Sequence, residues 1–465
     1  MNRRLRLAGW AAGLIVLAGP LTAALTFEPG EYAARRARFM EKIADGAAVF
    51  LGASAPASDV AFRQGHDFAY LTGVPVPNAF LVVDGLRKES VLFFTMTETD
   101  AQSEGIPRDF VRDPKVYTGV ERVLPAEQFG PFLANLCQRT RVLYTMYKPE
   151  EIGPENANEK FNTLQRTMTL SPWDGRLTRE LQFVRQLRDK FPQVDIRDCS
   201  SLVWELRKIK SAAELGVIRR AARIGVKAHR ALIQSTRPGV AEKSLAAVFE
   251  FVCGLEGAAG QAYSPIIMSG KNHAHGHYHA YDRILKAGDF VILDAGPDSD
   301  DYHVDISTSF PASGSFSARQ KELYEIALAV RDICLASYRP GVSFRQVGEK
   351  VAAMLKGKGL DAYAKDFAGI VRYGGYNHMI GLATHDVAGR FDGPNEVLVP
   401  GLVFACDIQL FRLEEEIGIR IEDTVAVTES GCENLSLGVP RTVAEIEALM
   451  REDGILQALR RKALI

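Results

Sequence analysis

Two stretches in the second half of the chain, DFVILDAG (289–296) and YHVDISTSF (302–310), decide the fold. Both are short apolar runs typical of buried strands, and the turn-forming residues between them predict a strand pair. Each run contains an aspartate, Asp294 or Asp305. Because burying an ionised carboxylate without a partner costs several kcal/mol, both aspartates need a compensating charge or hydrogen bond.

The same arrangement recurs nearer the C-terminus. GLVFACDIQL (401–410) and GIRIEDTVAVT (418–428) predict a second strand pair, which carries Asp407 and Glu422. The strand entries also match in spacing, with glycine three residues after leucine and aspartate six residues after glycine: Leu285, Gly288 and Asp294 against Leu398, Gly401 and Asp407. Chance similarity of two strand entries is the alternative, but it leaves the matched acids unexplained. We therefore expect an internal pseudo-twofold repeat.

Two pairs of buried acids favour a metal centre. A lone buried acid is more often hydrogen-bonded to backbone amides or paired with arginine, but four acids are compensated best by cations. His378, in GGYNHMIG (374–381), completes a set of five candidate ligands. The full set is Asp294, Asp305, His378, Asp407 and Glu422. Five ligands are enough for two divalent ions, and an oxygen-rich set with one nitrogen favours Mn²⁺, with Fe²⁺, Co²⁺ or Zn²⁺ as alternatives. Two such ions would activate water and stabilise an oxyanion, which indicates amide hydrolysis.

Two further histidines fit this chemistry. His277, in HAHGHYHAYD (273–282), and His385, in GLATHDV (381–387), could donate hydrogen bonds to the oxygen of a tetrahedral intermediate. The histidine run around His277 could instead be an exposed metal-binding tract or a polar loop.

Composition sets broad limits. A chain of 465 residues predicts two domains, since domains usually hold about 100–200 residues. Hydrophobic residues make up 47% and charged residues 24% of the chain, and the net charge of −1 comes without long runs of one sign. We expect no nucleic-acid partner. The six cysteines form no CxxC or Cys/His zinc pattern and are interpreted as buried small side chains.

The N-terminus has the pattern of an export signal. Arg3, Arg4 and Arg6 precede an apolar run over 7–18, and small residues follow Pro20. We predict a cleaved signal at 1–24 and a periplasmic or secreted protein. An uncleaved membrane anchor is the alternative.

The rest of the chain divides at about residue 200. Residues 25–200 alternate between helix and strand patterns, with strands at 46–53, 79–85 and 90–95, and contain no catalytic cluster. Residues 201–440 carry the acids, and 441–465 predict an amphipathic helical tail.

These motifs resemble the pita-bread metallopeptidases, in particular the aminopeptidase P and prolidase branch. The resemblance covers most of the chain. It is carried by FRQGHDFAYLTG (62–73), RKIKSAAEL (207–215), the LDAG and YHVDISTSFP pair, HMIGLATHD (378–386) and GIRIED (418–423). It implies an α/β creatinase-like N-terminal domain and an α+β pita-bread catalytic domain.

The resemblance also implies roles and partners. Asp294 would bind one metal, Asp305 and Glu422 would bridge both, and His378 would bind the other. His277 and His385 would support the transition state, and Arg420 would contact the ligands. Manganese dependence and a homodimer or homotetramer are implied as well.

The sequence departs from the family pattern at three positions. Asp407, followed by Ile-Gln, stands where a glutamate followed by Pro-Gly is usual. That glutamate is the expected proton acceptor, so the shorter acid bears on rate and metal spacing. Gly374 replaces a histidine that helps bind the prolyl side of the substrate, and Phe411 replaces a tyrosine.

The leading hypothesis is an exported Xaa-Pro aminopeptidase acting on peptides with proline in second position. A prolidase-like dipeptidase and a hydrolase or lyase acting on a non-peptide substrate are alternatives within the fold. A non-catalytic metal- or peptide-binding module is the alternative from another class.

Overall fold

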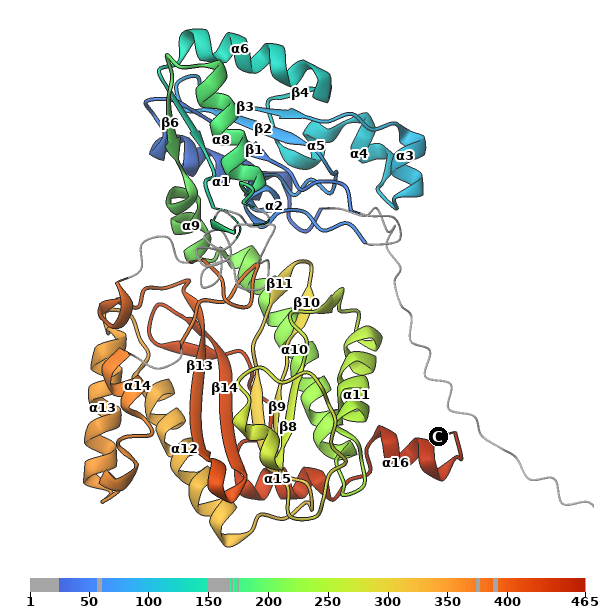
Figure 1. The fold of residues 1–465 in the computed structure, drawn as a ribbon, viewed down its shortest axis with the longest axis vertical. Helices are drawn as coiled ribbons and strands as arrows, with labels where there is room; N and C mark the ends of the chain where they lie inside the picture. The colour runs from blue at the N-terminus through green and yellow to red at the C-terminus, as the bar shows by residue number, and fades with distance from the viewer. Residues whose placement is uncertain are drawn as a thin grey trace, which may run out of the picture.

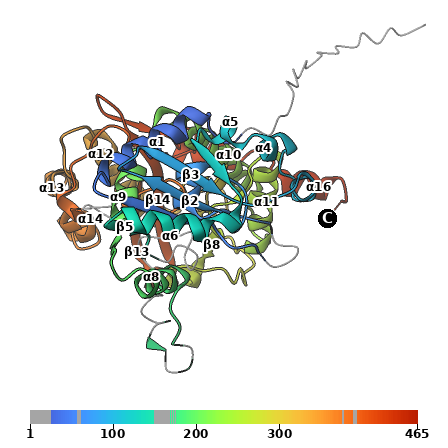
Figure 2. The ribbon, with the colours of Figure 1, turned by 90° about the horizontal axis from the view of Figure 1, so that it is seen from above.

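The computed structural model describes residues 25–56, 61–148, 168, 170, 171, 173, 175–373, 377–387 and 392–464. The predicted signal segment, 1–24, and Gly374 lie outside these residues. Within them, no helix has both the length and the apolar character needed to cross a bilayer. Figure 1 shows two domains stacked along the long axis, and Figure 2 shows the smaller N-terminal domain lying over the larger one.

The N-terminal domain is built on a six-stranded mixed sheet with the order β4-β3-β2-β1-β5-β6. Its strands are β1 (Ala47–Leu51), β2 (Phe80–Asp84), β3 (Glu89–Phe93), β4 (Arg122–Leu124), β5 (Val142–Thr145) and β6 (Asp195–Asp198). Its helices are α1 (Pro29–Lys42), α2 (His66–Thr72), α3 (Glu98–Ser103), α4 (Arg108–Arg112), α5 (Pro114–Thr118), α6 (Phe129–Arg139) and α8 (Arg179–Lys190). The three strands predicted at 46–53, 79–85 and 90–95 are β1, β2 and β3.

Alternation along β1 explains why helices cover both faces of this sheet. Ala48 and Phe50 pack with α1 and α2, while Ala47 and Val49 pack with α6 and α8. A strand buried on both faces has few polar positions, as its AAVFL sequence shows. The α/β class predicted for this domain is confirmed.

Helix α9 (Ser200–Lys208) leads into the C-terminal domain, whose helices cover one face of its main sheet. These helices are α10 (Ala212–Ser235), α11 (Glu242–Leu255), α12 (Ala318–Ser337), α13 (Phe344–Gly357) and α14 (Ala368–Tyr373). Ser211 and Glu214 form the predicted capping box at the start of α10.

The main sheet has the order β13-β14-β12-β9-β8, with β15 beside β14, and a three-stranded sheet runs β11-β10-β7. The strands are β7 (Gly260–Gln261), β8 (Ile266–Ser269), β9 (Phe290–Asp294), β10 (Pro297–Ser299), β11 (Tyr302–His303), β12 (Ser307–Pro311), β13 (Val403–Arg412), β14 (Ile417–Val427) and β15 (Cys432–Asn434). Both predicted strand pairs are present, as β9 with β12 and β13 with β14.

Side chains along these strands alternate between the two faces of the sheet, which separates the core residues from the predicted acids. Cys406 and Ile408 belong to the large core under the helices. Asp407 lies between them and therefore projects from the opposite face. The same alternation turns Glu422 away from the core that holds Ile421.

The structure refines the predictions for Asp305, the C-terminal tail and the cysteines. Asp305 lies just before β12 rather than within a strand. The C-terminal tail is two helices rather than one, α15 (Val443–Met450) and α16 (Ile455–Arg461). Gly454, the N-cap of α16, packs so closely on α10 that a Cβ atom would lie 2.4 Å from the Ser235 nitrogen. The six cysteines are free thiols, and all but the half-buried Cys432 are buried.

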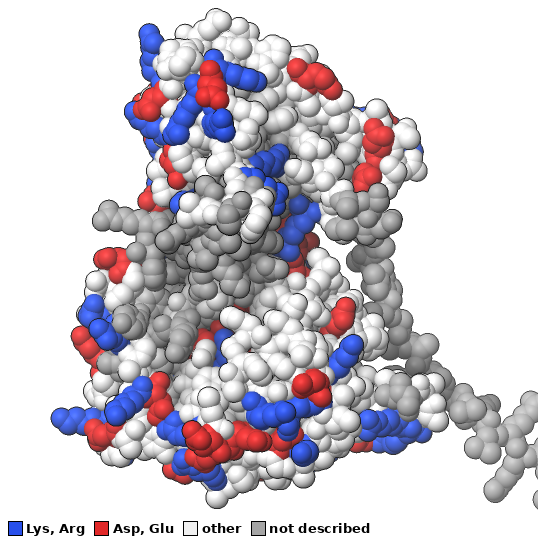
Figure 3. All heavy atoms as spheres, viewed as in Figure 1, with Lys and Arg blue, Asp and Glu red and all other residues white. Residues whose placement is uncertain are grey.

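Charged side chains are interspersed over the described surface in Figure 3, with acidic and basic groups often adjacent. Several of these pairs are ion pairs, such as Arg319 with Glu415 at 2.8 Å. The expectation that nucleic acid is not a partner stays a prediction.

Candidate active site

Strand register places three of the four acids in one row across the main sheet. Ser307 of β12 is the register partner of Asp294 on one side and of Glu422 on the other, and Glu422 is the partner of Asp407. Side chains at paired positions project from the same face of a sheet. Asp305, two residues before Ser307, joins the row from the segment between β11 and β12. All four acids are 3% exposed or less.

Arg420 connects the two strand pairs. It lies two residues before Glu422 on β14 and so shares its face. Its guanidinium contacts Asp294, lies 2.9 Å (Nη2) from Asp407 Oδ2, and lies 3.4 Å (Nη2) from Glu422 Oε2. One cation thus holds three carboxylates, which leaves the cluster with excess negative charge.

Tyr263 closes the other end of the row. Its hydroxyl donates to Asp294 Oδ1 at 2.5 Å and contacts Asp305. The segment AYSP around this tyrosine gave no sequence signal for a site residue, because a tyrosine in an apolar run is usually part of the core.

His378 faces the acids from the loop at 377–387, which we call the histidine loop. Its Nε2 lies 3.4 Å from Asp305 Oδ2 and 3.4 Å from Glu422 Oε1. Its Nδ1 lies 2.9 Å from the Thr384 carbonyl oxygen, which can only accept a hydrogen bond. Nδ1 therefore carries a proton, and Nε2 is the ring nitrogen directed at the acids, the orientation found in histidines that bind metals.

The electrostatics of the cluster indicate a shortage of positive charge. Burial, reinforced by the carboxylates of Asp305 and Asp407, raises the pKa of Glu422 to about 7. Burial also raises the pKa of Asp294 well above its usual value. Although burial disfavours a charged ring, Asp305 and Glu422 raise the pKa of His378 well above its usual value.

The residues present fit a divalent cation. Glu422 Oε1 and His378 Nε2 are buried atoms without a hydrogen-bond partner among the described residues, and they face each other. Ligand atoms of Asp294, Asp305 and Glu422 lie within 4.8 Å of one another, and so do those of Asp305, His378 and His385. The two groups share Asp305 and offer the oxygen and nitrogen donors that divalent ions use. Asp407 belongs to neither group and joins the row through its pairing with Glu422 and its contact with Arg420.

Of the four acids, Asp407 reaches a cavity of about 670 Å³ that His378 and both predicted catalytic histidines line. His385 stacks on His378 with ring centroids 3.9 Å apart. His277 lies on the cavity wall and is exposed. Asp407, Arg420 and Phe411 also line this cavity. The structure thus brings the predicted residues to one place, and their roles stay predictions.

Gln409 is a site residue that the sequence reasoning missed. It lies two residues after Asp407 on β13, on the same face, and its amide donates to Asp407 Oδ2 at 2.5 Å. Arg420 Nη2 approaches the same oxygen at 2.9 Å. The Ile-Gln sequence after Asp407, noted above as a departure from Pro-Gly, was the available signal.

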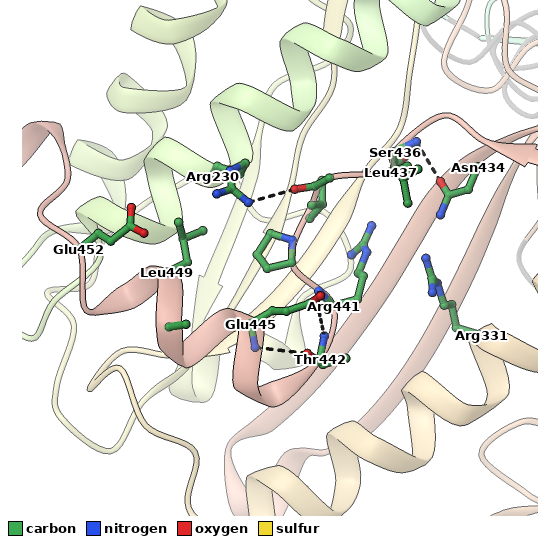
Figure 4. Close-up of a pocket in the computed structure, with 14 residues that line it drawn as sticks. Arg230, Arg331, Asn434, Ser436, Leu437, Arg441, Thr442, Glu445, Leu449 and Glu452 are labelled. Atoms are coloured by element: carbon green, nitrogen blue, oxygen red, sulfur yellow. Dashed lines mark hydrogen bonds between the residues drawn. The ribbon is translucent and has the colours of Figure 1, made fainter.

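A second cavity, also about 670 Å³, lies behind the row on the helix side of β14 (Figure 4). Arg331 and Arg441 line it, as Figure 4 shows. Both reach Asp423, which follows Glu422 on β14 and therefore projects from the opposite face. Arg441 also donates to the Glu422 carbonyl oxygen at 2.7 Å and to the Ser307 carbonyl oxygen at 2.6 Å. This arginine therefore braces the backbone of the acid row from behind.

Comparisons with known proteins agree with this architecture. Residues 216–429 match the model of metallopeptidase family M24, and residues 32–144 match the aminopeptidase P N-terminal domain. The Xaa-Pro aminopeptidase of Escherichia coli strain K12 is 30% identical over 452 residues, covering 90% of this chain and 97% of that protein.

Solved structures give the same result. Proline aminopeptidase P II from Yersinia pestis aligns with a TM-score of 0.74 at 29% identity, covering 91% of this chain and 100% of that one. Aminopeptidase PepP from Pseudomonas aeruginosa aligns with a TM-score of 0.75 at 28% identity, covering 92% of this chain and 99% of that one. The creatinase-like and pita-bread fold predicted from the sequence is confirmed, and the chain belongs to metallopeptidase family M24, with the N-terminal domain of the aminopeptidase P group.

Proposed function

We propose that this protein is a metal-dependent Xaa-Pro aminopeptidase that releases an N-terminal residue preceding proline. The carrying observation is the row of Asp294, Glu422 and Asp407, completed by Asp305 and His378. Within it, the buried atoms Glu422 Oε1 and His378 Nε2 face each other without a hydrogen-bond partner among the described residues. Such a cluster is costly to bury unless it holds cations.

The proposed cofactor is a pair of divalent ions held by these five residues, with Mn²⁺ as the first choice for an oxygen-rich set. When bound, such ions supply an activated water molecule and polarise the scissile carbonyl group. Arg420 keeps Asp294, Asp407 and Glu422 together, so the ligands are oriented before substrate arrives.

The cavity residues divide the remaining work. Asp407 is placed to accept a proton from the attacking water, since it lines the cavity and belongs to the row of acids. His277 and His385 are placed to donate hydrogen bonds to the oxygen that becomes negative as the carbonyl is attacked.

A bond before proline suits this chemistry. Proline lacks a backbone N–H and has a fixed φ, so enzymes that recognise that N–H bind it poorly. A site that acts on the carbonyl group does not need the missing donor. The Gly374 departure concerns the prolyl side of the substrate, so substrate range is the point to measure.

The decisive experiment is a peptide panel assayed with added Mn²⁺ and with chelator. We expect Xaa-Pro-Yaa peptides to be cleaved only with metal, and non-proline peptides to remain intact. Cleavage restricted to Xaa-Pro dipeptides would assign the prolidase-like alternative. A metal-free protein that stays inactive after Mn²⁺ addition would assign the binding-module alternative.

We also propose export to the periplasm or outside the cell, and assembly into a homodimer or homotetramer. The support for export is the pattern at 1–24. Fractionation with N-terminal sequencing tests export, and light scattering of the purified protein tests assembly.

A further inference from the structure

The FRQGHD segment (62–67) of the N-terminal domain has no part in the chemistry proposed above, yet it reaches the histidine loop. It precedes and begins α2, which lies at the junction with the C-terminal domain in Figure 1. The hydrophobic core is continuous across this junction. Phe68 and Tyr70 of α2 share one cluster with Ile380 and Leu382 of the loop.

A first polar path runs from Arg63 to His378. Arg63 Nη2 lies 3.0 Å from His303 Nε2, and His303 Nδ1 lies 3.1 Å from Thr384 Oγ1. The Thr384 carbonyl oxygen accepts the Nδ1 proton of His378 at 2.9 Å. The His303 backbone N–H also donates to the Gly381 carbonyl oxygen at 2.8 Å, so His303 contacts the loop twice.

Arg63 also fixes the proton of His303. A guanidinium can only donate, so His303 Nε2 must accept and Nδ1 must carry the proton toward Thr384. Asp298 Oδ2 lies near the same nitrogen at 3.4 Å, but Arg63 Nη1 approaches that oxygen more closely, at 3.0 Å. Each contact in the path therefore has a defined direction.

A second path runs from Asp67 to the residue after His385. Arg207 Nη1 lies 2.7 Å from Asp67 Oδ1, and its Nη2 lies 2.5 Å from Asp386 Oδ1. Lys210 Nζ contacts the other Asp386 oxygen at 3.3 Å. These four charged residues are all at most 4% exposed. The Asp386 backbone N–H donates to the Met379 carbonyl oxygen at 2.8 Å, which ties the loop to itself.

Gly381 shows how closely the loop folds around this network. A Cβ atom there would lie 2.1 Å from Asp386 Oδ2 and 2.9 Å from Lys210 Cε. No side chain therefore fits at position 381 while the Asp386 carboxylate occupies this place.

We propose that Arg63 is a positioning residue through which the N-terminal domain sets the orientation of His378, on a histidine loop that the network of Asp67, Arg207 and Asp386 also holds. The inference rests on the proposed function for what that histidine does. The N-terminal domain would then do more than cover the cavity, because both paths end next to residues that line the cavity rather than at the outer surface.

The test uses the full chain with Arg63→Met, Arg63→Lys, Thr384→Val and the Arg63→Met/Thr384→Val pair. Calorimetry measures Mn²⁺ binding to the metal-free protein, and kinetics at saturating Mn²⁺ separate kcat from KM. Because residues that orient metal-binding histidines commonly change affinity or activity by about 10–100-fold, we expect Arg63→Met to weaken Mn²⁺ binding and lower kcat by about 10-fold each. KM should change little, Arg63→Lys should recover part of the loss, and the pair should be no worse than the poorer single variant.

Asp301→Asn is the matched control, because Asp301 Oδ1 is the exposed partner of the same guanidinium, 3.5 Å from Arg63 Nε, and lies off the path. It should behave as wild type. Unchanged Mn²⁺ affinity and kcat in Arg63→Met, or fully additive losses in the pair, would overturn the proposal. Calorimetry needs no peptide, so it decides this inference even if wild type cleaves none of the panel. If Arg63→Met does not fold, Thr384→Val and Arg63→Lys carry the same comparison.

Discussion

The two strand pairs that hold the acids differ in the length of their pairing and in how much they depend on contacts with other parts of the molecule. The second pair is continuous, with ten consecutive register partners from Val403 with Ala426 to Arg412 with Ile417. The first pair has five partners, from Phe290 with Pro311 to Asp294 with Ser307. The chain then leaves the main sheet to form β10 and β11 before it returns.

This excursion makes the first pair depend on the rest of the molecule. Asp305 lacks a strand partner, and Thr424 Oγ1 substitutes for one by accepting from the Asp305 N–H at 2.9 Å and donating to its carbonyl oxygen at 2.8 Å. Gly296 permits the crossing, since a Cβ atom there would lie 1.7 Å from the Val304 carbonyl oxygen. The same excursion carries Asp298 and His303 to Arg63. The irregular pair thus links the acids to the N-terminal domain, while the regular pair supplies a rigid base.

The largest expected effect comes from the irregular pair. Asp305→Asn replaces a carboxylate that faces His378 Nε2 at 3.4 Å and Tyr263. We expect kcat/KM for an Xaa-Pro-Yaa peptide to fall about 1,000-fold, because the two proposed metal ions lose one negatively charged ligand. The backbone bonds with Thr424 remain, so circular dichroism and the melting temperature should change little. Full activity in this variant would count against a two-metal site.

The next largest effect concerns β13 and β14, and it is measured by removing Arg441, which supports the backbone at Glu422. Arg441→Met removes donors to the Glu422 and Ser307 carbonyl oxygens and leaves Asp423 with Arg331 as its remaining ion-pair partner among the described residues. The side chain is 8% exposed, and breaking a buried pair is costly, so we expect the free energy of unfolding in urea to fall by about 3 kcal/mol.

Arg230→Met is the control for that variant. Arg230 lines the same cavity but is exposed, and its Nη1 contacts the Gly438 carbonyl oxygen at 3.2 Å. Its loss should cost less than about 0.5 kcal/mol. Equal losses in the two variants would show that the cavity, rather than the brace behind Glu422, sets stability.

The same contrast explains what the sequence could predict. Long regular strands can be predicted from their apolar pattern. The pattern therefore predicted β13 and β14, together with the positions of Asp407 and Glu422 on them. The matched spacing before Asp294 and Asp407 correctly predicted a second strand pair. The excursion was not predicted, because β10 and β11 are only three and two residues long, too short to show a period.

Contacts made by common residue types were also out of reach. Tyr263, Gln409 and Thr384 touch the site through a hydroxyl group, an amide and a backbone carbonyl oxygen. Nothing in the local sequence of Tyr263 or Thr384 distinguishes them from core or loop residues, because their roles depend on long-range pairing. Gln409 carried a signal, the Ile-Gln sequence after Asp407, but that signal did not show what the amide contacts. The acids could be predicted since a carboxylate in an apolar run violates the ordinary burial pattern.

Tyr263→Phe measures the smaller local contribution to the first pair. The variant keeps the ring and removes the hydroxyl that donates to Asp294 at 2.5 Å and contacts Asp305. A hydrogen bond to a charged group contributes about 1.5–3 kcal/mol. Because bound cations would share the task of holding these carboxylates, we expect the lower end, a loss of about 10-fold in kcat/KM. The Mn²⁺ affinity from calorimetry should fall in parallel, and an unchanged affinity would place the hydroxyl outside the ligand network.

The smallest effect concerns the departure within the second pair, Asp407 with Gln409. Restoring the usual acid alone, as Asp407→Glu, should not help, because the Gln409 amide lies 2.5 Å from Asp407 Oδ2 and fills the space a longer side chain needs. Asp407→Glu combined with Gln409→Gly should raise kcat/KM by about 5-fold over Asp407→Glu alone, since residues in contact are energetically coupled. Gln409→Gly alone should lower activity, because Asp407 then loses the donor that orients it. If Asp407→Glu alone had the same kcat/KM as the double variant, Gln409 would have no effect on the acid at position 407. The two strand pairs would then differ in geometry but not in how their acids are held.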